Sequence, residues 1–397
     1  MGKTMKYLIL GAGPAGLAAA NILMDRGEDS FLVLEKEEEA GGLCRSEEVG
    51  GFPLDIGGGH FLDTRVTKAQ EYILRFMPEE EWNRYSRSTK IDMYGTIIDN
   101  PIEAHIWQFP LEEQVSYIKS VAYAGANTGA PMPEDFVGWI YWKLGSKIAD
   151  EYMLPYNKKM FGHYLEQLGT YWLYKLPTVN LDDTLLSCLE HKMFGKYPAH
   201  TEFFYPGKYG FGEVWNRMAE RIKEHIEFGV SVDSVDCANR RVNGKYEADC
   251  IINTIPWPEF KRMENCSESV AEYCRILPYT SLEVKYFSEN IEEDYQWIYY
   301  PDLKLPYHRK FFRANYLEGA KGGYYETNVE RAVSDSGWRY INQYAYPCNT
   351  VEKPRMINAI LKEMEKNKIY GIGRWGEWEH LNADVVVAHA QELLEKI

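Results

Sequence analysis

A glycine-rich hexapeptide near the amino terminus carries the most specific chemistry in the sequence. Its residues, Gly11-Ala12-Gly13-Pro14-Ala15-Gly16, follow a short apolar run and precede an alanine-rich stretch. Between a strand and a helix, the first glycine of such a motif allows a tight turn and the second lets the backbone approach a pyrophosphate. The third allows the helix to pack closely on the strand. Because free N–H groups and the helix dipole at this point stabilise negative charge, the motif predicts a dinucleotide site.

A carboxylate at the expected distance supports this prediction. Glu35 lies 19 residues after Gly16 and directly follows the second apolar run, residues 31–34. An acid in this position accepts hydrogen bonds from the ribose hydroxyls of an adenine dinucleotide, and its charge disfavours the 2′-phosphate of NADP. A glycine-rich turn that binds nothing is the alternative. The strand, the spacing and the acid together favour the dinucleotide.

Three later segments favour FAD over NAD. Residues 41–46 form a second glycine loop, whose arginine is able to pair with phosphate. Residues 54–60 offer a backbone slim enough to lie against a flat ring, and the amides of residues 371–374 could meet ribityl or flavin oxygens. The expected cofactor-binding residues are Gly11, Gly13, Pro14, Ala15, Gly16, Glu35, Lys36, Gly42, Leu43, Arg45, Gly58, Gly59, Gly373 and Arg374.

The elements that must position these residues alternate in type along the chain. Apolar runs at 6–10 and 31–34 predict strands on either side of a helix over 17–24. Helical periods then dominate from about 66 to 200, for example over 112–122 and 136–160. A helix is expected over 213–225, followed by strands over 230–236, 240–246 and 248–254. Residues 280–346 are expected to form an antiparallel region, and residues 369–397 a strand, a glycine turn and a helix.

This order predicts an α/β protein in which one Rossmann-type domain is interrupted twice. Residues 1–65, 200–256 and 366–397 are expected to form the FAD-binding domain. Residues 66–199 are expected to form a mainly helical substrate lobe, and residues 257–365 an antiparallel-sheet substrate lobe.

Composition excludes several classes of partner. Lys plus Arg number 44 against 59 Asp plus Glu, and this acidic balance of −15 argues against nucleic-acid binding. The seven cysteines include no C-x-x-C pair, so neither a zinc site nor a disulfide framework is indicated. An unpatterned set of cysteines fits a cytoplasmic protein, and no uninterrupted apolar run of about 18 residues predicts a membrane span.

Several blocks of sequence resemble the FAD-dependent UDP-galactopyranose mutases, within the broader superfamily of amine-oxidase-like and protoporphyrinogen-oxidase-like flavoproteins. The amino-terminal motif identifies only the superfamily. The blocks that are more specific to the mutases are Gly58-Gly59-His60-Phe61, Met153-Leu154-Pro155-Tyr156-Asn157-Lys158-Lys159-Met160-Phe161-Gly162, Tyr307-His308-Arg309, Asn315-Tyr316, Tyr346-Pro347 and Gly373-Arg374-Trp375-Gly376.

The resemblance implies a pyranose–furanose isomerisation of a nucleotide sugar without net redox change. In such mutases N5 of the reduced flavin attacks the anomeric carbon and the nucleoside diphosphate leaves. The N5–sugar adduct then opens and recloses as a furanose, which the same diphosphate re-attacks. NAD(P)H or another donor would first reduce the flavin. The implied setting is the synthesis of a surface polysaccharide or glycolipid.

The resemblance also assigns roles to individual residues. It implies a catalytic set of His60 beside the flavin ring, Arg309 on the diphosphate, Lys175 in a mobile loop and Arg374 near the flavin. His60 thereby joins the cofactor-binding residues. The implied substrate-binding residues are Asn157, Phe161, Lys175, Arg309, Asn315, Tyr316, Tyr346 and His380.

Four positions depart from the mutase pattern. Lys175 replaces an arginine and loses its bidentate geometry. Asp63 stands where bacterial mutases have a second histidine, Phe161 replaces a tryptophan near the sugar, and His380 occupies the position of a tyrosine. A changed sugar, a changed nucleotide or a different flavin reaction would each explain the set.

Residue type alone leaves other roles and other functions open. Arg309 in a basic stretch fits a solvated surface charge, His60 a structural histidine, Tyr346 a turn anchor and Lys175 a charge at a helix C-terminus. The alternative enzyme is a conventional FAD-dependent oxidoreductase of the amine-oxidase or desaturase type, and a non-catalytic flavin-binding protein is the third hypothesis. The sugar, the nucleotide, the physiological reductant and the oligomeric state, including a homo-oligomer, stay undetermined.

Overall fold

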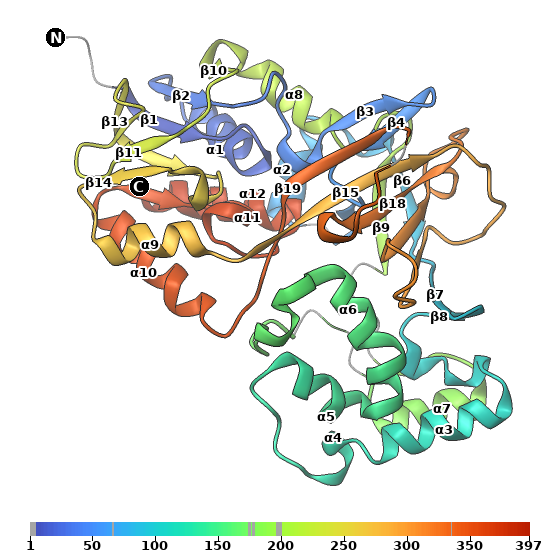
Figure 1. Cartoon of the computed structure of the whole chain (residues 1–397). Helices are drawn as coiled ribbons and strands as arrows, with labels where there is room; N and C mark the ends of the chain where they lie inside the picture. The colour runs from blue at the N-terminus through green and yellow to red at the C-terminus, as the bar shows by residue number, and fades with distance from the viewer. Residues whose placement is uncertain (1–4, 66, 174–175, 177–178, 196–200, 335) are drawn as a thin grey trace.

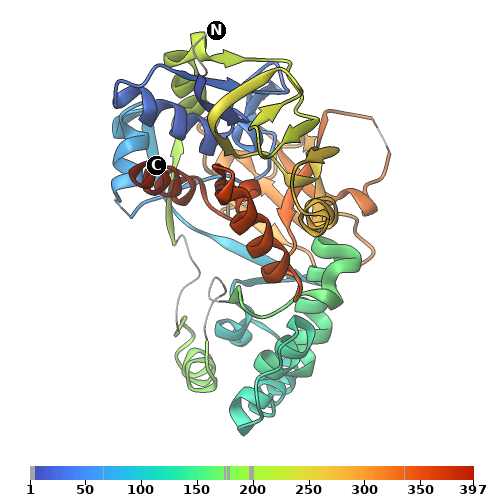
Figure 2. The same ribbon diagram turned by 90° about the vertical axis from the view of Figure 1, so that its left-hand side faces the viewer.

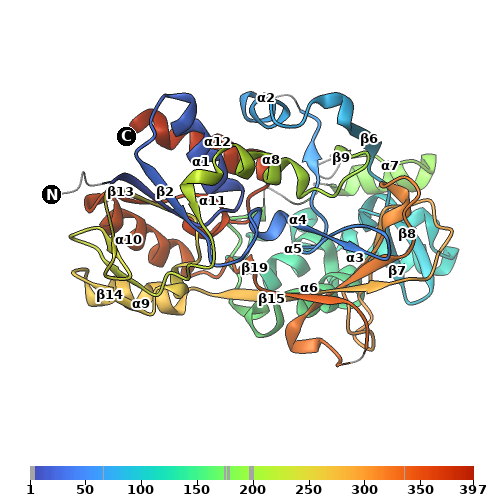
Figure 3. The ribbon, with the colours of Figure 1, turned by 90° about the horizontal axis from the view of Figure 1, so that it is seen from above.

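Strands from widely separated parts of the chain form a mostly parallel sheet at one end of the molecule (Figures 1 and 3). The structure is a computed structural model that describes residues 5–65, 67–173, 176, 179–195, 201–334 and 336–397. The parallel strands are β1 (Met5–Leu10), β2 (Phe31–Leu34), β10 (Ile226–Glu227), β13 (Tyr246–Asn253) and β20 (Ile369–Gly371). An edge is added to them by β11 (Ser234–Asp236), β12 (Arg241–Val242) and β14 (Arg262–Glu264).

Helices cover both faces of this sheet because its central strands are apolar throughout. Ile9 belongs to a core with residues of α1 and α12, whereas its neighbour Leu8 belongs to a core with residues of α10. Successive strand residues point to opposite faces, so an unbroken apolar strand needs cover on both. The helices are α1 (Pro14–Asp25), α8 (Glu213–Arg221) and α12 (Ala383–Lys396) on one face, α2 (Lys68–Leu74) against α12, and α9 (Glu268–Ile276) and α10 (Lys353–Lys366) on the other face.

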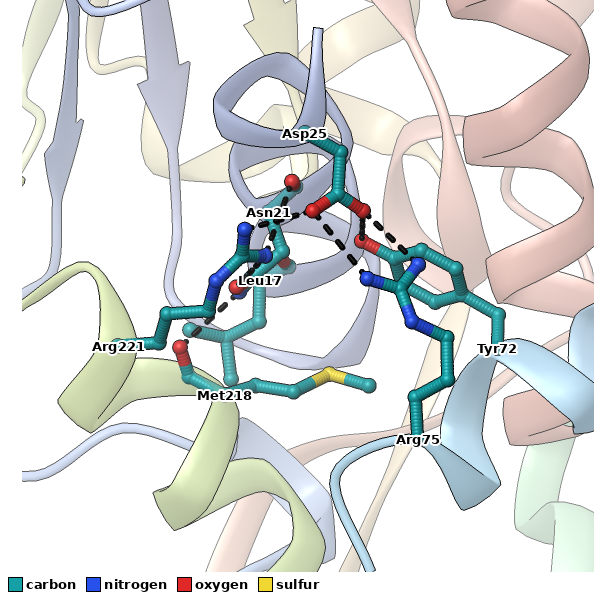
Figure 4. A network of polar contacts seen from close by, with 7 residues as sticks. All are labelled: Leu17, Asn21, Asp25, Tyr72, Arg75, Met218 and Arg221. Carbon is teal, nitrogen blue, oxygen red and sulfur yellow. Dashed lines mark hydrogen bonds and ion pairs between the residues drawn. The ribbon is translucent and has the colours of Figure 1, made fainter. Parts of the chain in front are cut away.

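Polar contacts fasten the carboxy-terminal end of α1 to α2 and α8 (Figure 4). Asp25 accepts hydrogen bonds from Arg75 at 3.0 Å and from Arg221 at 2.6 Å. The fully buried Asn21 donates to the main-chain carbonyl of Met218 at 3.0 Å. Since α1 starts inside the glycine motif, these contacts fix the helix whose amino-terminal end faces the dinucleotide site.

A second, seven-stranded sheet lies beside the first, and its long strands β15 and β19 extend back toward the parallel sheet (Figures 1 and 3). All pairs are antiparallel except β16 with β7. Its strands, in spatial order, are β19 (Arg339–Pro347), β15 (Tyr279–Phe287), β18 (Gly323–Asn328), β17 (Arg309–Phe312), β16 (Trp297–Tyr299), β7 (Thr89–Met93) and β8 (Thr96–Asp99). Smaller sheets are formed by β3 (Ser46–Val49) with β4 (Phe52–Asp55), and by β5 (Leu62–Asp63), β9 (Glu202–Pro206) and β6 (Trp82–Ser86).

A group of helices, green and teal in Figures 1 and 2, projects from the end of the molecule below the seven-stranded sheet. Trp139 and Ile140 lie in its core, so the apolar face of the helix that carries them packs against neighbouring helices. This group contains α3 (Leu111–Ala122), α4 (Gly125–Thr128), α5 (Phe136–Ile148), a π-helical turn (Ala149–Met153), α6 (Leu154–Phe161) and α7 (Leu181–Glu190). None of the helices in the described ranges has the length and apolarity needed to cross a membrane.

The structure differs from the sequence-based expectation at two places. Residues 82–99 were expected in the helical lobe, but they form β6, β7 and β8, and β7 pairs with β16 of the seven-stranded sheet. Residues 262–276 and 353–366 were expected in the sheet lobe, but β14, α9 and α10 pack with the parallel sheet. Periodicity says which face of an element is apolar, but it does not say which sheet that face covers.

Candidate functional site

A cavity of about 420 Å³ opens where β1, β2 and β13 end. Its wall includes Gly11 after β1, Glu35 after β2 and Thr254 after β13. In open α/β sheets, ligands bind outside the carboxyl ends of the strands, so this is the place that the fold provides for a dinucleotide. The predicted residues that line it are Gly11, Gly13, Pro14, Ala15, Glu35, Lys36, Gly42, Leu43, Arg45, His60 and Arg374.

The glycines of the motif serve two different purposes. A Cβ at Gly16 would collide with the carbonyl of Gly11, so Gly16 is required by the contact between helix and strand. At Gly13 the backbone is extended (φ −77°), and the nearest atom to a Cβ there would be Cα of Gly42 at 3.9 Å. The protein itself therefore leaves room for a side chain at Gly13. The free space is what a pyrophosphate lying against the backbone would need.

The polar groups at the ribose and phosphate end also fit a dinucleotide. Glu35 is buried, which raises the pKa of its carboxyl, and it accepts hydrogen bonds from the N–H groups of Ala12 at 2.7 Å and Glu37 at 3.0 Å. Arg45 donates to the hydroxyl of Tyr340 at 2.5 Å, while its buried Nε has no hydrogen-bond partner. An orphaned guanidinium N–H in the wall of the cavity suits a phosphate oxygen.

The carboxy-terminal motif reaches the cavity through α11 (Gly373–Gly376). A Cβ at Gly373 would lie 2.6 Å from Cβ of Ala15, so this turn sits directly on the start of α1. The Gly373 N–H donates to Glu377 at 2.9 Å, and Glu377 also accepts from Nδ1 of His389 at 2.8 Å. That N–H is therefore occupied within the protein, although a contact with flavin oxygens was predicted for the amides of this segment. Gly373 contributes a close approach of the chain instead.

Arg374, next to this turn, presents a guanidinium to the cavity. It donates to the main-chain carbonyls of Ala345 at 3.4 Å and Leu381 at 3.0 Å. Within the described ranges it forms no ion pair with a carboxylate at 4.0 Å or less. Its positive charge is therefore available to an anionic or electron-rich ligand.

His60 is a neutral side chain in the same wall. Burial, followed by the positive charges of Arg374 and Arg309, lowers the pKa of His60 to about 3. Its Nδ1 lies 3.1 Å from the carbonyl of Gly58, which can only accept a hydrogen bond, so Nδ1 carries the proton. Nε2 is consequently the acceptor. The side chain is held in one tautomer and adds no charge to the cavity.

Arg309 lies on β17 and is neutralised by a carboxylate that the sequence analysis did not single out. Glu326 on β18 is fully buried and forms an ion pair with Arg309, with 2.6 Å between Nε and Oε2. Its other oxygen accepts the N–H of Gly59 at 3.0 Å. At Gly58, where φ is +86°, a Cβ would collide with Glu326. Glu326 thus joins the loop that carries His60 to Arg309, and it excludes the reading of Arg309 as a solvated surface charge.

Tyrosines from three elements surround Arg309. Arg309 donates to the hydroxyl of Tyr346 on β19 at 3.2 Å, and the ring of Tyr346 meets that of His380 edge-on at 5.3 Å between centroids. Tyr156 on α6 and Tyr299 on β16 also meet edge-on, at 5.4 Å. Burial and then the charge of Glu326 raise the pKa of Tyr346, and the charges of Arg309 and Arg374 offset only part of this rise. Three predicted residues, Arg309, Tyr346 and His380, are therefore neighbours.

Other predicted substrate-binding residues are engaged elsewhere. The amide of Asn157 donates to the carbonyl of Met153 at 2.7 Å, and the mostly buried Phe161 belongs to the core of the helical group. Asn315 holds a neighbouring loop by donating to two carbonyls, at 2.6 and 2.8 Å, and Tyr316 is buried among aromatic rings. None of these four lines the cavity, and neither do Arg309, Tyr346 and His380. A contact of any of these residues with substrate stays a prediction.

Asp63 and Lys175 are two of the four departures from the mutase pattern, and of these two the structure describes only Asp63. Asp63 is buried, and it receives the Nε–H of Arg65 at 2.9 Å. Its carboxylate thus closes a local turn. Lys175 lies outside the described residues.

The residues that the sequence analysis missed act through long-range pairing. Glu326, Tyr340 and the Glu377–His389 pair contact the site from β18, β19, α11 and α12. The one available signal was a carboxylate in the strand Gly-Tyr-Tyr-Glu-Thr-Asn, at a position that the rest of the strand predicts to be buried.

Comparisons with known proteins agree with this geometry. A family model described as an NAD(P)-binding Rossmann-like domain matches residues 9–77. Over 92 residues, which are 22% of this chain and 88% of the relative, the sequence is 37% identical to an uncharacterized protein in the nifH2 3′ region of Methanothermococcus thermolithotrophicus. The matched segment is thus close to the whole of that relative.

Solved structures match over the full chain at low sequence identity. A crystal structure of reduced UDP-galactopyranose mutase superposes with a TM-score of 0.89 at 21% identity, covering 100% of this chain and 95% of that chain. A putative protoporphyrinogen oxidase from Exiguobacterium sp. 255-15 gives a TM-score of 0.71 at 14% identity, covering 99% and 98%. At these identities the likeness shows the fold, and it confirms the predicted α/β class and the resemblance at that level. The chain belongs to the same family as the Methanothermococcus protein and has the fold of the UDP-galactopyranose mutases and protoporphyrinogen-oxidase-like proteins.

Proposed function

We propose that this chain is a flavin-dependent mutase that interconverts the pyranose and furanose forms of a nucleotide sugar. One observation carries the proposal: His60 and Arg374 both line the cavity, and the charge of Arg309 acts on the same His60 from the neighbouring sheet. A redox enzyme of the same fold needs the cavity but has no need for guanidinium groups beside it. An anionic leaving group does need them.

The group expected in the cavity is FAD. Gly13 and the amino-terminal end of α1 would hold its pyrophosphate, Glu35 its adenosine ribose, and Arg45 a phosphate oxygen. When bound and reduced, FAD would supply the nucleophile of the reaction. NAD(P)H is the external reductant that we expect.

The side chains of this protein would bind and orient the substrate. Arg309 and Tyr346 form one polar wall, and their N–H and O–H groups suit the oxygens of a diphosphate. His60 stays neutral at physiological pH, so it does not compete with these groups for the anion, and its Nε2 can accept a hydrogen bond from a neighbouring N–H or O–H group.

The direct test uses the reduced protein and a panel of nucleotide hexoses that includes UDP-galactose. Purified protein reduced with dithionite should convert one of them to its furanose isomer, detected by chromatography and NMR, and the oxidised protein should not. Oxygen consumption with an amine or another reduced substrate, without isomerisation of any nucleotide hexose, would instead establish the conventional oxidoreductase.

A further inference from the structure

Arg309 alone cannot neutralise a diphosphate in this site. Its guanidinium is paired with Glu326, a fully buried carboxylate that has no access to solvent, so the two side chains together contribute no net charge. A diphosphate carries more than one negative charge and must lose part of its hydration on binding. A second guanidinium close to Arg309 would supply further hydrogen-bond donors for the diphosphate oxygens.

The structure holds such a cation in the link between β6 and β7. The main chain at this link is clamped, because the N–H of Arg87 donates to the carbonyl of Thr201 at 2.8 Å and the N–H of Ser88 donates to Gln296 at 2.6 Å. The guanidinium of Arg87 lies over the ring of Trp297, 5.0 Å from its centroid. A backbone fixed on both sides and a stacked side chain define where the charge lies.

Tyr299 connects this arginine to the site. Arg87 donates to the Tyr299 hydroxyl oxygen at 3.1 Å, and Trp297 donates to the same oxygen at 2.9 Å. Burial alone would raise the pKa of Tyr299, but the charges of Arg87 and then Arg309 lower it below its ordinary value. One hydroxyl group is thus influenced by both guanidinium groups.

The same side chains lead to the predicted flavin side of the site. The ring of Trp297 stacks on that of Phe61 with 5.4 Å between centroids, and Phe61 directly follows His60. Arg87 is therefore connected to the loop of His60 through Trp297 and Phe61.

We propose that Arg87 is a second substrate-binding guanidinium, which shares the anionic diphosphate of the ligand with Arg309 and is oriented by Tyr299. This inference rests on the proposed function, because it assumes a ligand with a diphosphate.

The test measures binding of UDP to the flavin-loaded protein by isothermal titration calorimetry. Arg87→Gln should weaken UDP about tenfold or more, since it removes a charge-assisted hydrogen bond, and Arg87→Lys should recover part of the loss by restoring the charge. Arg84→Gln is the matched control, because Arg84 lies three residues earlier, is exposed and pairs with Glu202. It should bind UDP like the parent. Flavin content and melting temperature should be unchanged in all three variants.

Each outcome separates this inference from the proposed function. An Arg87→Gln variant that folds, retains flavin and binds UDP like the parent would overturn the inference, as would an equal loss in Arg84→Gln. If the parent isomerises a nucleotide hexose and Arg87→Gln binds UDP equally well, the proposed function stands and the inference about Arg87 fails. If UDP binding depends on Arg87 but no nucleotide hexose isomerises, the anion site stands and the proposed function fails.

Discussion

The two halves of the candidate site are built in different ways. The dinucleotide half is formed largely by main chain, at three strand ends and one helix start, and its specificity lies in where side chains are missing, as at Gly13. The substrate half is formed by side chains from β16, β17, β18 and β19 that depend on one another for charge and orientation, as Arg309 does on Glu326. The first half should tolerate the loss of a single side chain better than the second. The second should fail when any one partner is removed.

The largest effect should come from breaking the ion pair in the substrate half. Glu326→Ala would leave the guanidinium of Arg309 unpaired in a mostly buried position, and it would also remove the acceptor of the Gly59 N–H. We expect a loss of about 3 kcal/mol in the free energy of unfolding, measured by urea denaturation. The double variant Glu326→Ala with Arg309→Met should recover part of that loss. A single variant as stable as the parent would show that the pair is not needed.

A glycine substitution should sharpen the contrast by affecting the ligand and not the fold. Gly13→Ala has room in the protein, so the melting temperature of the flavin-free chain should be unchanged, while FAD affinity falls about 100-fold because the methyl group occupies the place of the pyrophosphate. Fluorescence titration with FAD measures the change. Gly16→Ala is the comparison, because its methyl group would collide with the carbonyl of Gly11 and should lower the melting temperature of the flavin-free chain. Equal behaviour of the two variants would contradict the division of roles between these glycines.

The Glu377–His389 pair should make the attachment of the carboxy-terminal motif depend on pH. The hydrogen bond that His389 donates to Glu377 raises the pKa of His389 above its ordinary value. Because the pKa of His389 is raised in the folded state, the stabilisation is complete below its unfolded-state pKa, near 6.5. It is lost as the pH rises through its folded-state pKa. We expect the parent to lose about 1 kcal/mol in the free energy of unfolding across that pH window. Thermal denaturation at several pH values measures this loss. Glu377→Gln should abolish this dependence, and a variant with the parent's pH profile would rule out the pair as its source.

The smallest effect should come from the network that fastens α1, far from the ligand. Burial alone would raise the pKa of Asp25, but hydrogen bonds from Arg75 and Arg221 hold it below its ordinary value. Because the pKa of Asp25 is lowered in the folded state, the stabilisation is present above its unfolded-state pKa. It is lost as the pH falls through its folded-state pKa. Asp25→Asn should cost about 1 kcal/mol at neutral pH and less in acid, measured by urea denaturation. FAD affinity should stay within twofold, and a larger loss would mean that the network reaches the cavity.

Sequence alone predicted the dinucleotide half well because its signals are local. The glycine motif, the two strands beside it and Glu35 lie within one stretch of chain, and the structure has β1, α1 and β2 there. The apolar runs of these strands also indicated a parallel sheet, since strands covered on both faces show no alternation.

The substrate half could not be predicted in the same way because it depends on register. Glu326 reaches Arg309 only because β17 and β18 pair with these two residues level, and nothing in either segment specifies that alignment. Likewise Arg87 acts on Tyr299 because β7 joins β16, a pairing between segments that are about 200 residues apart along the chain. The resemblance to the mutases predicts that Arg309 and Tyr346 bind the ligand, but it gave no reason to look for Glu326, which links Arg309 to the loop of His60.

The proposed mutase activity depends most directly on which dinucleotide the cavity binds. Flavin-free protein should be titrated with FAD and, separately, with NAD and NADP, with bound cofactor quantified by absorbance after gel filtration. We predict one FAD per chain, retained through the column, and no retained nicotinamide dinucleotide. Protein that stays colourless with FAD and retains NAD instead would contradict the proposed cofactor and, with it, the mutase.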